Sequence, residues 1–281
     1  MNTSTYLSDD LSSFAAWLGG EGKSGGTTEK YLRDLRAFTG YLAGRELTRE
    51  TAAQWREELL CRGYAPVTVN SMLAAVNAYC RFAGVDIHLK FVKIQRKLFR
   101  EQSRELTQAE YRRLVESACN SGNERLALLM ETICASGIRV SEVPYITVEA
   151  AQNGKAVISL KGKVRTIMLS GKLCRKLLKY AKKQKIASGE IFLTKSGKGF
   201  SRRQIWAEMK RLCKVSGVEA SKVFPHNLRH LFATTFYRIY KDIAHLADVL
   251  GHSSIDTTRI YLVTTGQEHQ NSWNGWVCSC R

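Results

Sequence analysis

The sequence predicts a mainly α-helical, α+β fold of two domains, in which one small β-hairpin interrupts the helices of the second domain. Apolar residues recur at helical spacing over much of the chain of 281 residues, which indicates amphipathic helices. Two neighbouring runs are instead rich in β-branched residues and flank one glycine, as in a hairpin. A basic stretch interrupts the helical pattern well before the hairpin, so we expect the domain boundary there.

The N-terminal domain, residues 1–86, is predicted to consist of four amphipathic helices. The clearest of them carries one apolar stripe, formed by Tyr31, Leu35, Phe38 and Leu42. Glycines close all four helices, and the sequence GGEGKSGG at 19–26 is predicted to be a flexible loop. We expect the helices at residues 7–18, 28–42, 51–60 and 66–82.

The basic stretch at 87–104 is predicted to be an interdomain linker. Residues 88–104 read HLKFVKIQRKLFREQSR, a sequence that is rich in Lys and Arg and poor in turn-forming residues. The charge alone would equally suit the solvated end of a basic helix. The C-terminal domain, residues 105–281, then begins with a capping box formed by Thr107 and Glu110, which predicts the start of a helix.

The predicted hairpin joins residues 155–160 (KAVISL) to residues 164–169 (VRTIML) through a turn centred on Gly162. Lys161 and Lys163 flank that glycine and are therefore expected at the tip of the hairpin. We expect further elements of this domain at residues 172–185 and 201–215, both helical, and at 190–193, a short strand.

Composition and charge limit the function of the chain. The 43 Lys and Arg residues exceed the 25 Asp and Glu residues and give a formal net charge of +18. Such an excess favours a polyanionic partner, most simply nucleic acid, with an anionic membrane surface as the alternative. No apolar run approaches the roughly 20 residues of a membrane-spanning helix, and the N-terminus has no signal-peptide pattern. We therefore expect a soluble, cytoplasmic protein.

The eight cysteines are dispersed and include no Cys-x-x-Cys pair, which argues against a zinc site. Several lie in apolar helical contexts, as buried free thiols do in a reducing cytoplasm. Cys278 and Cys280 near the C-terminus form one close pair, which is weak support for a metal site. We predict no metal ion and no cofactor.

Residues 226–262 gather side chains that suit phosphate chemistry better than a core. They read HNLRHLFATTFYRIYKDIAHLADVLGHSSIDTTRIYL. In phosphoryl transfer, charge spreads over the non-bridging oxygens, and the fork of a guanidinium can stabilise it without a metal. Arg229 in this segment and Arg139 in SGIRVSE are the candidates. His226 precedes Arg229 by three residues and is expected on the same helix face.

Tyr261 is the candidate nucleophile. A tyrosine hydroxyl has a pKa of about 10 and needs positive charge or a base nearby before it attacks. His226 and His252, together with the arginines, would supply both. A lysine at the hairpin tip, Lys161 or Lys163, could protonate the departing 5′ oxygen.

Taken singly, each of these residues has an ordinary structural interpretation, and only their joint occurrence indicates a site. The other two histidines of the segment, His230 and His245, are interpreted as structural. Residues 243–262 also read as a helix-turn-helix with Gly251 at the turn, so a binding module without catalysis is an alternative.

Four motifs together resemble the tyrosine recombinases, the phage-type integrase family. They are SGIRVSEV at 136–143, KGKVRTIML at 161–169, HNLRHLFAT at 226–234 and LGHSSIDTTRIYL at 250–262. In addition, TTEKYLRDLRAFTGYL and TVNSMLAAVNAYCRFAG resemble the family's N-terminal core-binding domain, so the resemblance covers most of the chain. It implies a helical core-binding domain and a catalytic domain that close around DNA as a C-shaped clamp.

The resemblance implies a phosphate-binding role for three of the candidates. Arg139 and Arg229 would clamp the scissile phosphate, and His252 would donate a hydrogen bond to it. Glu142 matches an acidic residue that supports the fold around the first arginine.

The remaining candidates have implied roles in bond breaking. Tyr261 would attack the phosphate and form a 3′-phosphotyrosyl link, with His226 assisting the removal of its proton. Lys161 would protonate the 5′ oxygen, but the turn is one residue shorter than the common form, which leaves Lys163 as an alternative. The link conserves bond energy, so neither ATP nor a metal would be needed.

The same resemblance implies site-specific strand exchange at double-stranded DNA attachment sites, for the integration or excision of a mobile element. It implies a homotetramer on DNA, a monomer or weak dimer when free, and DNA-bending or directionality proteins as accessory partners. A type IB-like topoisomerase is the alternative enzyme. The tail 271–281, NSWNGWVCSCR, departs from the helix that docks on a neighbouring subunit in many relatives. The candidate contacts to DNA are Arg33, Arg36, Lys163, Arg165, Arg202 and Arg203.

Overall fold

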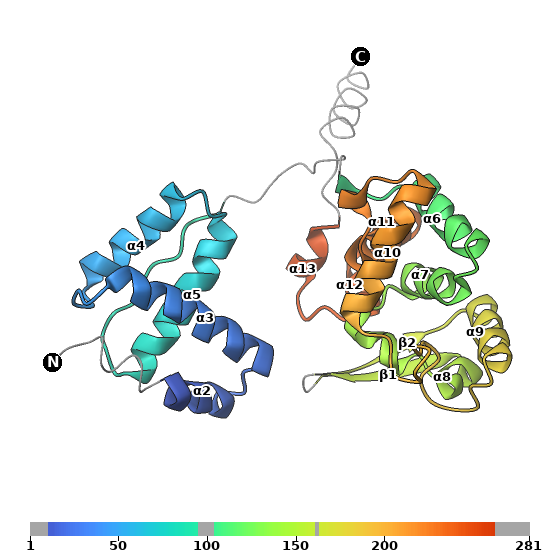
Figure 1. The fold of residues 1–281 in the computed structure, drawn as a ribbon, viewed down its shortest axis with the longest axis horizontal. Helices are drawn as coiled ribbons and strands as arrows, with labels where there is room; N and C mark the ends of the chain where they lie inside the picture. Colours follow the sequence, from blue (N-terminus) through green and yellow to red (C-terminus); the bar gives the residue numbers. More distant parts are fainter. Residues whose placement is uncertain (1–10, 95–103, 161–162, 262–281) are drawn as a thin grey trace, which may run out of the picture. The chain divides into compact units, whose positions relative to one another are not determined.

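The computed structural model describes residues 11–94, 104–160 and 163–261. The chain divides into two compact units, Met1–Arg96 and Lys97–Arg281, and each has an apolar core of its own (Figure 1). The mainly helical fold with one small hairpin is confirmed. Within the described ranges, no helix has the length and apolar character needed to cross a membrane.

The described part of the N-terminal unit is built from four helices: α2 (Leu11–Gly20), α3 (Gly25–Leu42), α4 (Arg49–Cys61) and α5 (Pro66–Phe82). The apolar stripe of α3 packs inward, and its Phe38 contacts Trp55 of α4 with ring centroids 4.7 Å apart. The loop predicted at 19–26 is shorter in the structure, because α2 continues through Gly20. Ser24 then caps α3 by accepting a hydrogen bond from the backbone of Thr27.

The first part of the predicted linker packs along α5. The Asn77 side chain accepts a hydrogen bond from the Leu89 amide at 2.8 Å and donates one to the Leu89 carbonyl at 3.0 Å. Asn70 makes the same pair of bonds with Val92, at 2.7 and 2.9 Å. Each side-chain amide therefore pairs with the backbone as a neighbouring strand would. Residues 95–103 lie outside the described residues, and the domain limits at 86 and 104 stay predictions.

The C-terminal unit begins with the predicted capping box, which is confirmed at Thr107 and Glu110. The strand predicted at 190–193 is wrong, because that segment forms isolated bridges instead, Thr147 with Glu190 and Leu193 with Gly199. The helices of this unit are α6 (Gln108–Asn120), α7 (Glu124–Ser136), η2 (Val140–Tyr145), α8 (Val148–Asn153), α9 (Gly171–Lys183), α10 (Arg202–Ser216), η3 (Ala220–Lys222), α11 (Pro225–Tyr240), α12 (Ile243–Leu250) and α13 (Ile255–Arg259).

The predicted hairpin is confirmed. Strands β1 (Lys155–Leu160) and β2 (Lys163–Met168) pair in antiparallel register. Ile158 and Ile167 face the core, whereas Val164 is exposed, as the period of two in a strand requires. The two residues of the tip, 161–162, lie outside the described residues.

Helices α7 and α11 pack against each other and bring distant parts of the sequence together. Gly137 caps α7 with φ +65°, a left-handed conformation that glycine adopts readily. A Cβ atom there would lie 2.5 Å from the Phe232 ring of α11, so the glycine also permits the close approach of the two helices. Arg139 follows this cap, and His226 and Arg229 lie in the first turns of α11.

Candidate active site

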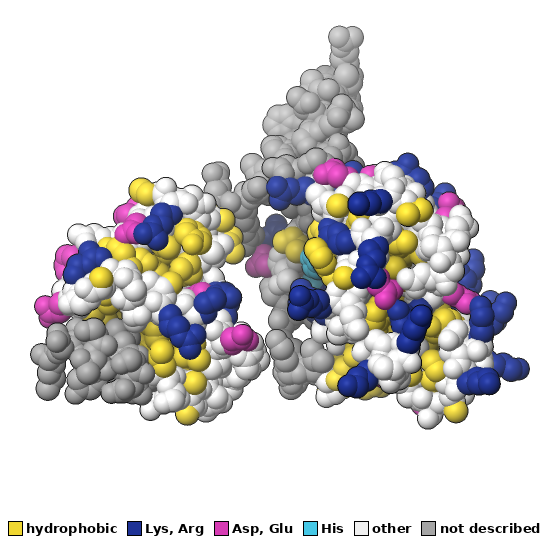
Figure 2. All heavy atoms as spheres, viewed as in Figure 1, with side chains coloured by type: hydrophobic (Ala, Val, Ile, Leu, Met, Phe, Trp, Pro, Cys, Tyr) yellow, Lys and Arg dark blue, Asp and Glu magenta, His cyan; other side chains and the backbone are white. Residues whose placement is uncertain are grey.

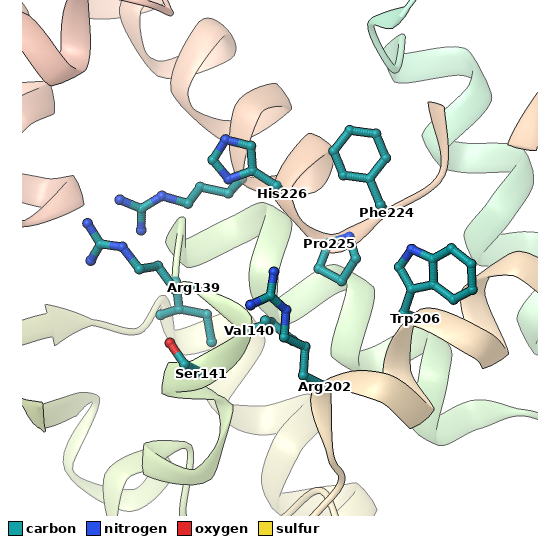
Figure 3. Close-up of a pocket in the computed structure, with 10 residues that line it drawn as sticks. Arg139, Val140, Ser141, Arg202, Trp206, Phe224, Pro225 and His226 are labelled. Atoms are coloured by element: carbon teal, nitrogen blue, oxygen red, sulfur yellow. The ribbon is translucent and has the colours of Figure 1, made fainter. Parts of the chain in front are cut away.

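A pocket of about 320 Å³ in the C-terminal unit is lined by three of the predicted site residues, Arg139, His226 and Arg229. Arg202 and Trp206 lie in the first turns of α10 and line the pocket across from Arg139 (Figure 3). His226 is exposed and Arg229 is only 2% exposed, so a buried guanidinium lies beneath more accessible basic groups. This arrangement suits the binding of a phosphate.

The buried guanidinium of Arg229 joins three other segments. It donates to the carbonyl of Gly137, to the carbonyl of Leu250 at 2.8 Å, and to Nε2 of His252 at 3.0 Å. At most two of the five N–H groups of an arginine then remain for a ligand. Burial lowers the pKa of Arg229 to about 10, so the side chain still carries its charge at neutral pH.

His252 is held as a neutral imidazole. Because arginine has no acceptor, Nε2 of His252 must accept the bond from Arg229. Nδ1 then carries the proton and donates it to Oγ1 of Thr258, 2.8 Å away. Burial, followed by the charges of Arg229 and Arg139, lowers the pKa of His252 to about 4. A hydrogen bond from Nε2 to a phosphate therefore requires this nitrogen to gain a proton.

Tyr261 lies inside the C-terminal unit and is 4% exposed. Its ring stacks on that of His252, with centroids 6.0 Å apart, and contacts that of His230 at 5.0 Å. The phenol of Tyr261 lies beside the guanidinium of Arg229. Its charge and its hydrogen bond raise the pKa of Arg229 and so oppose the effect of burial. Its apolar neighbours are Ala233, Leu246 and Leu250.

The histidine of α11 whose ring packs on Tyr261 is His230, which sequence analysis interprets as structural. It is 6% exposed, whereas His226 is exposed and lines the pocket. The two histidines are four residues apart and so share one side of the helix. The spacing in HNLRH therefore places His230 on the same side of the helix as His226. That Tyr261 packs against this side is known only from the fold.

Glu142 supports Arg139 as the resemblance implies. Its side chain is 3% exposed and accepts from Nη1 of Arg139 at 3.0 Å. It also accepts from the backbone amide of Arg139 at 2.7 Å. Burial alone would raise the pKa of Glu142, but the bond from the Arg139 backbone and the charge of Arg165 outweigh it and hold that pKa below its ordinary value. Glu142 therefore stays ionised at neutral pH.

Trp206 is a further pocket residue that sequence analysis missed. Its indole is 50% exposed, and the ammonium of Lys210 lies 5.2 Å from the ring centroid. The sequence signal is its distance of four residues from Arg202 on a predicted helix, which indicates one shared face.

The other predicted residues lie at separate places. Arg33 and Arg36 are exposed on α3 of the N-terminal unit, and Arg203 is exposed beside Arg202 on α10. Lys and Arg predominate over Asp and Glu on the visible face of the C-terminal unit (Figure 2). Lys163 begins β2, and Lys161 lies outside the described residues. Across the described ranges, no group of three or more His, Cys, Asp or Glu side chains is arranged to hold a metal ion.

The fold and the site together define a class of protein. A helical N-terminal unit precedes a second unit in which two arginines and a histidine share a pocket next to a buried tyrosine. This combination is that of the tyrosine recombinases. Residues 104–268 match the phage integrase family, and residues 11–84 match its N-terminal SAM-like domain. The chain belongs to the phage integrase family and is a tyrosine recombinase.

Among its relatives is the tyrosine recombinase XerA of Pyrococcus horikoshii, which is 30% identical over 265 residues, covering 92% of this chain and 90% of the relative. XerA of Pyrococcus furiosus is 28% identical over 275 residues, covering 95% and 93%. Among solved structures, the Tn1549 transposon integrase in complex with transposon right end DNA has a TM-score of 0.73 at 16% identity, covering 99% of this chain and 100% of that one. A lambda integrase dimer bound to a core site has a TM-score of 0.70 at 18% identity, covering 91% and 76%.

Proposed function

We propose that the protein exchanges strands between double-stranded DNA attachment sites and so integrates or excises a mobile element. The observation that carries this proposal is the pocket shared by Arg139, His226 and Arg229, with Tyr261 and His252 against Arg229. The formal net charge of +18 supports a nucleic-acid substrate. The likeness to integrases solved in complex with transposon end DNA and on a core site supports the same substrate.

The two arginines act on the scissile phosphate. Arg139 and Arg229 bind its non-bridging oxygens and stabilise the negative charge that builds up in the transition state. Arg229 suits this task because it is buried, so that its charge is poorly screened by water. Its bonds to the carbonyls of Gly137 and Leu250 fix the guanidinium before the substrate arrives.

The phenol oxygen of Tyr261 attacks the phosphorus. A 3′-phosphotyrosyl bond forms and the bond from phosphorus to the 5′ oxygen breaks. His226 assists the removal of the phenol proton. Once Nε2 of His252 has gained a proton, His252 donates a hydrogen bond to the phosphate. Lys161, with Lys163 as the alternative, delivers a proton to the departing oxygen.

The second half of the reaction reverses the first. The 5′ hydroxyl of another strand attacks the phosphotyrosyl bond, restores the phosphodiester and releases Tyr261. Because the bond energy is kept throughout, the reaction needs no ATP, and the arginines supply positive charge without a metal. Two sites are paired by a homotetramer, in which each subunit binds DNA through both of its domains. The free protein is a monomer or weak dimer, and DNA-bending or directionality proteins assist it.

The test uses nicked duplexes tiled over the DNA that flanks the gene. A nick close to the cleavage position lets the short fragment that carries the free 5′ hydroxyl diffuse away, so the covalent protein–DNA link accumulates. We expect the wild-type protein to form this link with one or a few duplexes and Tyr261→Phe to form none. A wild-type protein that binds these duplexes and never becomes linked would instead be a DNA-binding module.

Supercoiled plasmid separates the proposal from a type IB-like topoisomerase. We expect relaxation or recombination only on plasmids that carry the duplex identified above. Rapid relaxation of a plasmid without that sequence would contradict site-specific exchange.

A further inference from the structure

The guanidinium of Arg165 is directed into the protein. Arg165 lies on β2, and its side chain is 15% exposed. It forms an ion pair with Glu142 and donates through Nη1 to the carbonyl of Val249 at 3.1 Å. The first partner lies in η2 and the second in α12, so this one side chain joins the hairpin to two other elements.

The carboxylate that Arg165 contacts is also the one that holds Arg139. Oε1 of Glu142 accepts from Nη1 of Arg139 at 3.0 Å, and Oε2 accepts from its backbone amide at 2.7 Å and from Arg165. Without Arg165, one buried oxygen of Glu142 would lose a charged partner, and the carboxylate could turn with Arg139 attached. The orientation of Arg139 toward the pocket therefore depends on Arg165.

Arg165 also fills the space beside the turn that precedes His252. A Cβ atom built on Gly251 would lie 2.4 Å from Cδ and 2.7 Å from Nη1 of Arg165. Gly251 has φ +63°, a conformation that favours glycine independently. The turn and the arginine thus fit against each other directly before His252, whose Nε2 contacts Arg229.

We infer that Arg165 is a positioning residue for strand cleavage and is not a contact to the DNA backbone. The inference rests on the function proposed above and corrects the interpretation of Arg165 drawn from its charge. Arg165 fixes Arg139 through Glu142 and fixes the turn before His252 through Val249, while its own strand leads to the hairpin tip. A lysine cannot replace it, because an ammonium cannot reach a carboxylate and a carbonyl with separate rigid donors.

The test compares Arg165→Met and Arg165→Lys with Arg175→Met, a control at an exposed arginine of α9. Formation of the covalent link is followed in single turnover at saturating nicked DNA. We expect a rate constant lowered about 10²-fold in Arg165→Met, as a displaced catalytic group produces, and about tenfold in Arg165→Lys, which keeps the charge. Arg175→Met should react at the wild-type rate.

DNA affinity is measured separately, in the Tyr261→Phe background and over a range of salt concentrations. We expect the Kd and its salt dependence to be unchanged by either substitution of Arg165. If Arg165 instead touches a phosphate, Arg165→Met will weaken binding and reduce the salt slope by about 1, with the saturated rate unchanged, which would overturn the inference.

A purely structural role has a different signature. Partial unfolding would lower the fraction of protein that reacts and the melting temperature, with the rate constant of the remaining protein unchanged, and this result would also overturn the inference. If Arg165→Met does not fold, the test rests on Arg165→Lys. A wild-type rate constant of link formation in that variant would contradict the inference. A wild-type protein that forms no link refutes the proposed function and the inference with it. A wild-type link that Arg165 variants form equally fast refutes the inference alone.

Discussion

At the scale of single residues, Arg229 combines a structural role with the phosphate-binding role proposed for it. It is 2% exposed and donates to carbonyls at the ends of α7 and α12. A buried charge is tolerated only when its hydrogen-bonding groups are satisfied. The same bonds that satisfy Arg229 also fix its guanidinium, as the proposed phosphate clamp requires.

Arg229→Lys should lower the rate of covalent link formation by about 10²-fold or more, because an ammonium cannot bridge two phosphate oxygens. DNA affinity should fall only slightly, since other basic residues contribute most of it. The melting temperature should also fall, because a hydrogen bond to a charged group contributes about 1.5–3 kcal/mol. Single-turnover cleavage and calorimetry measure the two effects, and wild-type cleavage by this variant would contradict the clamp.

His252 should make the stability of the C-terminal unit depend on pH. Its pKa is lowered to about 4 by burial and by Arg229, against about 6.5 in an unfolded chain. The unfolded chain therefore binds more protons between these values, so the contribution is complete above pH 6.5 and is lost as pH falls toward 4. Melting temperatures of wild type and His252→Gln should converge on acidification. A constant difference between them from pH 7 to 4 would contradict this assignment.

Sequence alone could predict residues that lie close together along the chain. The spacing of His226 and Arg229 on one helix is such a case, and both line the pocket. The contact of His230 with Tyr261 could not be predicted, because it depends on how the segment after α12 returns to α11. The ion pair of Arg165 with Glu142 likewise spans 23 residues and two elements, and a solvated basic side chain was the simpler interpretation.

At the scale of elements, the hairpin connects the core of the C-terminal unit to the predicted general acid. Ile158 and Ile167 anchor β1 and β2 in the core. The strands therefore hold the base of the hairpin in place, while the lysine at its tip is the predicted proton donor.

Lys161→Ala should react slowly with ordinary DNA and be rescued by a substrate whose bridging 5′ oxygen is replaced by sulfur. A thiolate leaves without a proton, so the general acid is no longer needed. Single-turnover rates on the two substrates measure the rescue. Rescue of Lys163→Ala instead would identify Lys163 as the general acid. Rescue of neither variant would show that no lysine of the hairpin tip is the general acid.

Several elements that local signals specify were predicted, but the short helix α8 was missed although Thr147 caps it. Capping residues and apolar periodicity determined the helices, and β-branched runs determined the hairpin. The segments whose structure depends on tertiary contacts were not predicted. The bridges at Thr147 and Leu193 need distant partners, and the packing of residues 87–94 along α5 needs Asn70 and Asn77 to act as backbone partners.

At the scale of the whole molecule, the proposed function assigns DNA binding to both units and strand cleavage to the C-terminal unit. The N-terminal unit carries exposed arginines on α3, and the C-terminal unit holds the pocket and Tyr261. The excess of basic residues should attract DNA in a manner that weakens with salt. Sequence specificity must then come from contacts to base edges or from the shape of the DNA, which charge alone does not read.

The most direct test of this account identifies the amino acid that becomes attached to DNA. The covalent complex formed on nicked duplex is digested with protease and nuclease, and the nucleotide-bearing peptide is sequenced by mass spectrometry. We expect a single modified residue, Tyr261, joined through its phenol oxygen to a 3′ phosphate. Attachment at any other residue, or to a 5′ phosphate, would contradict the account.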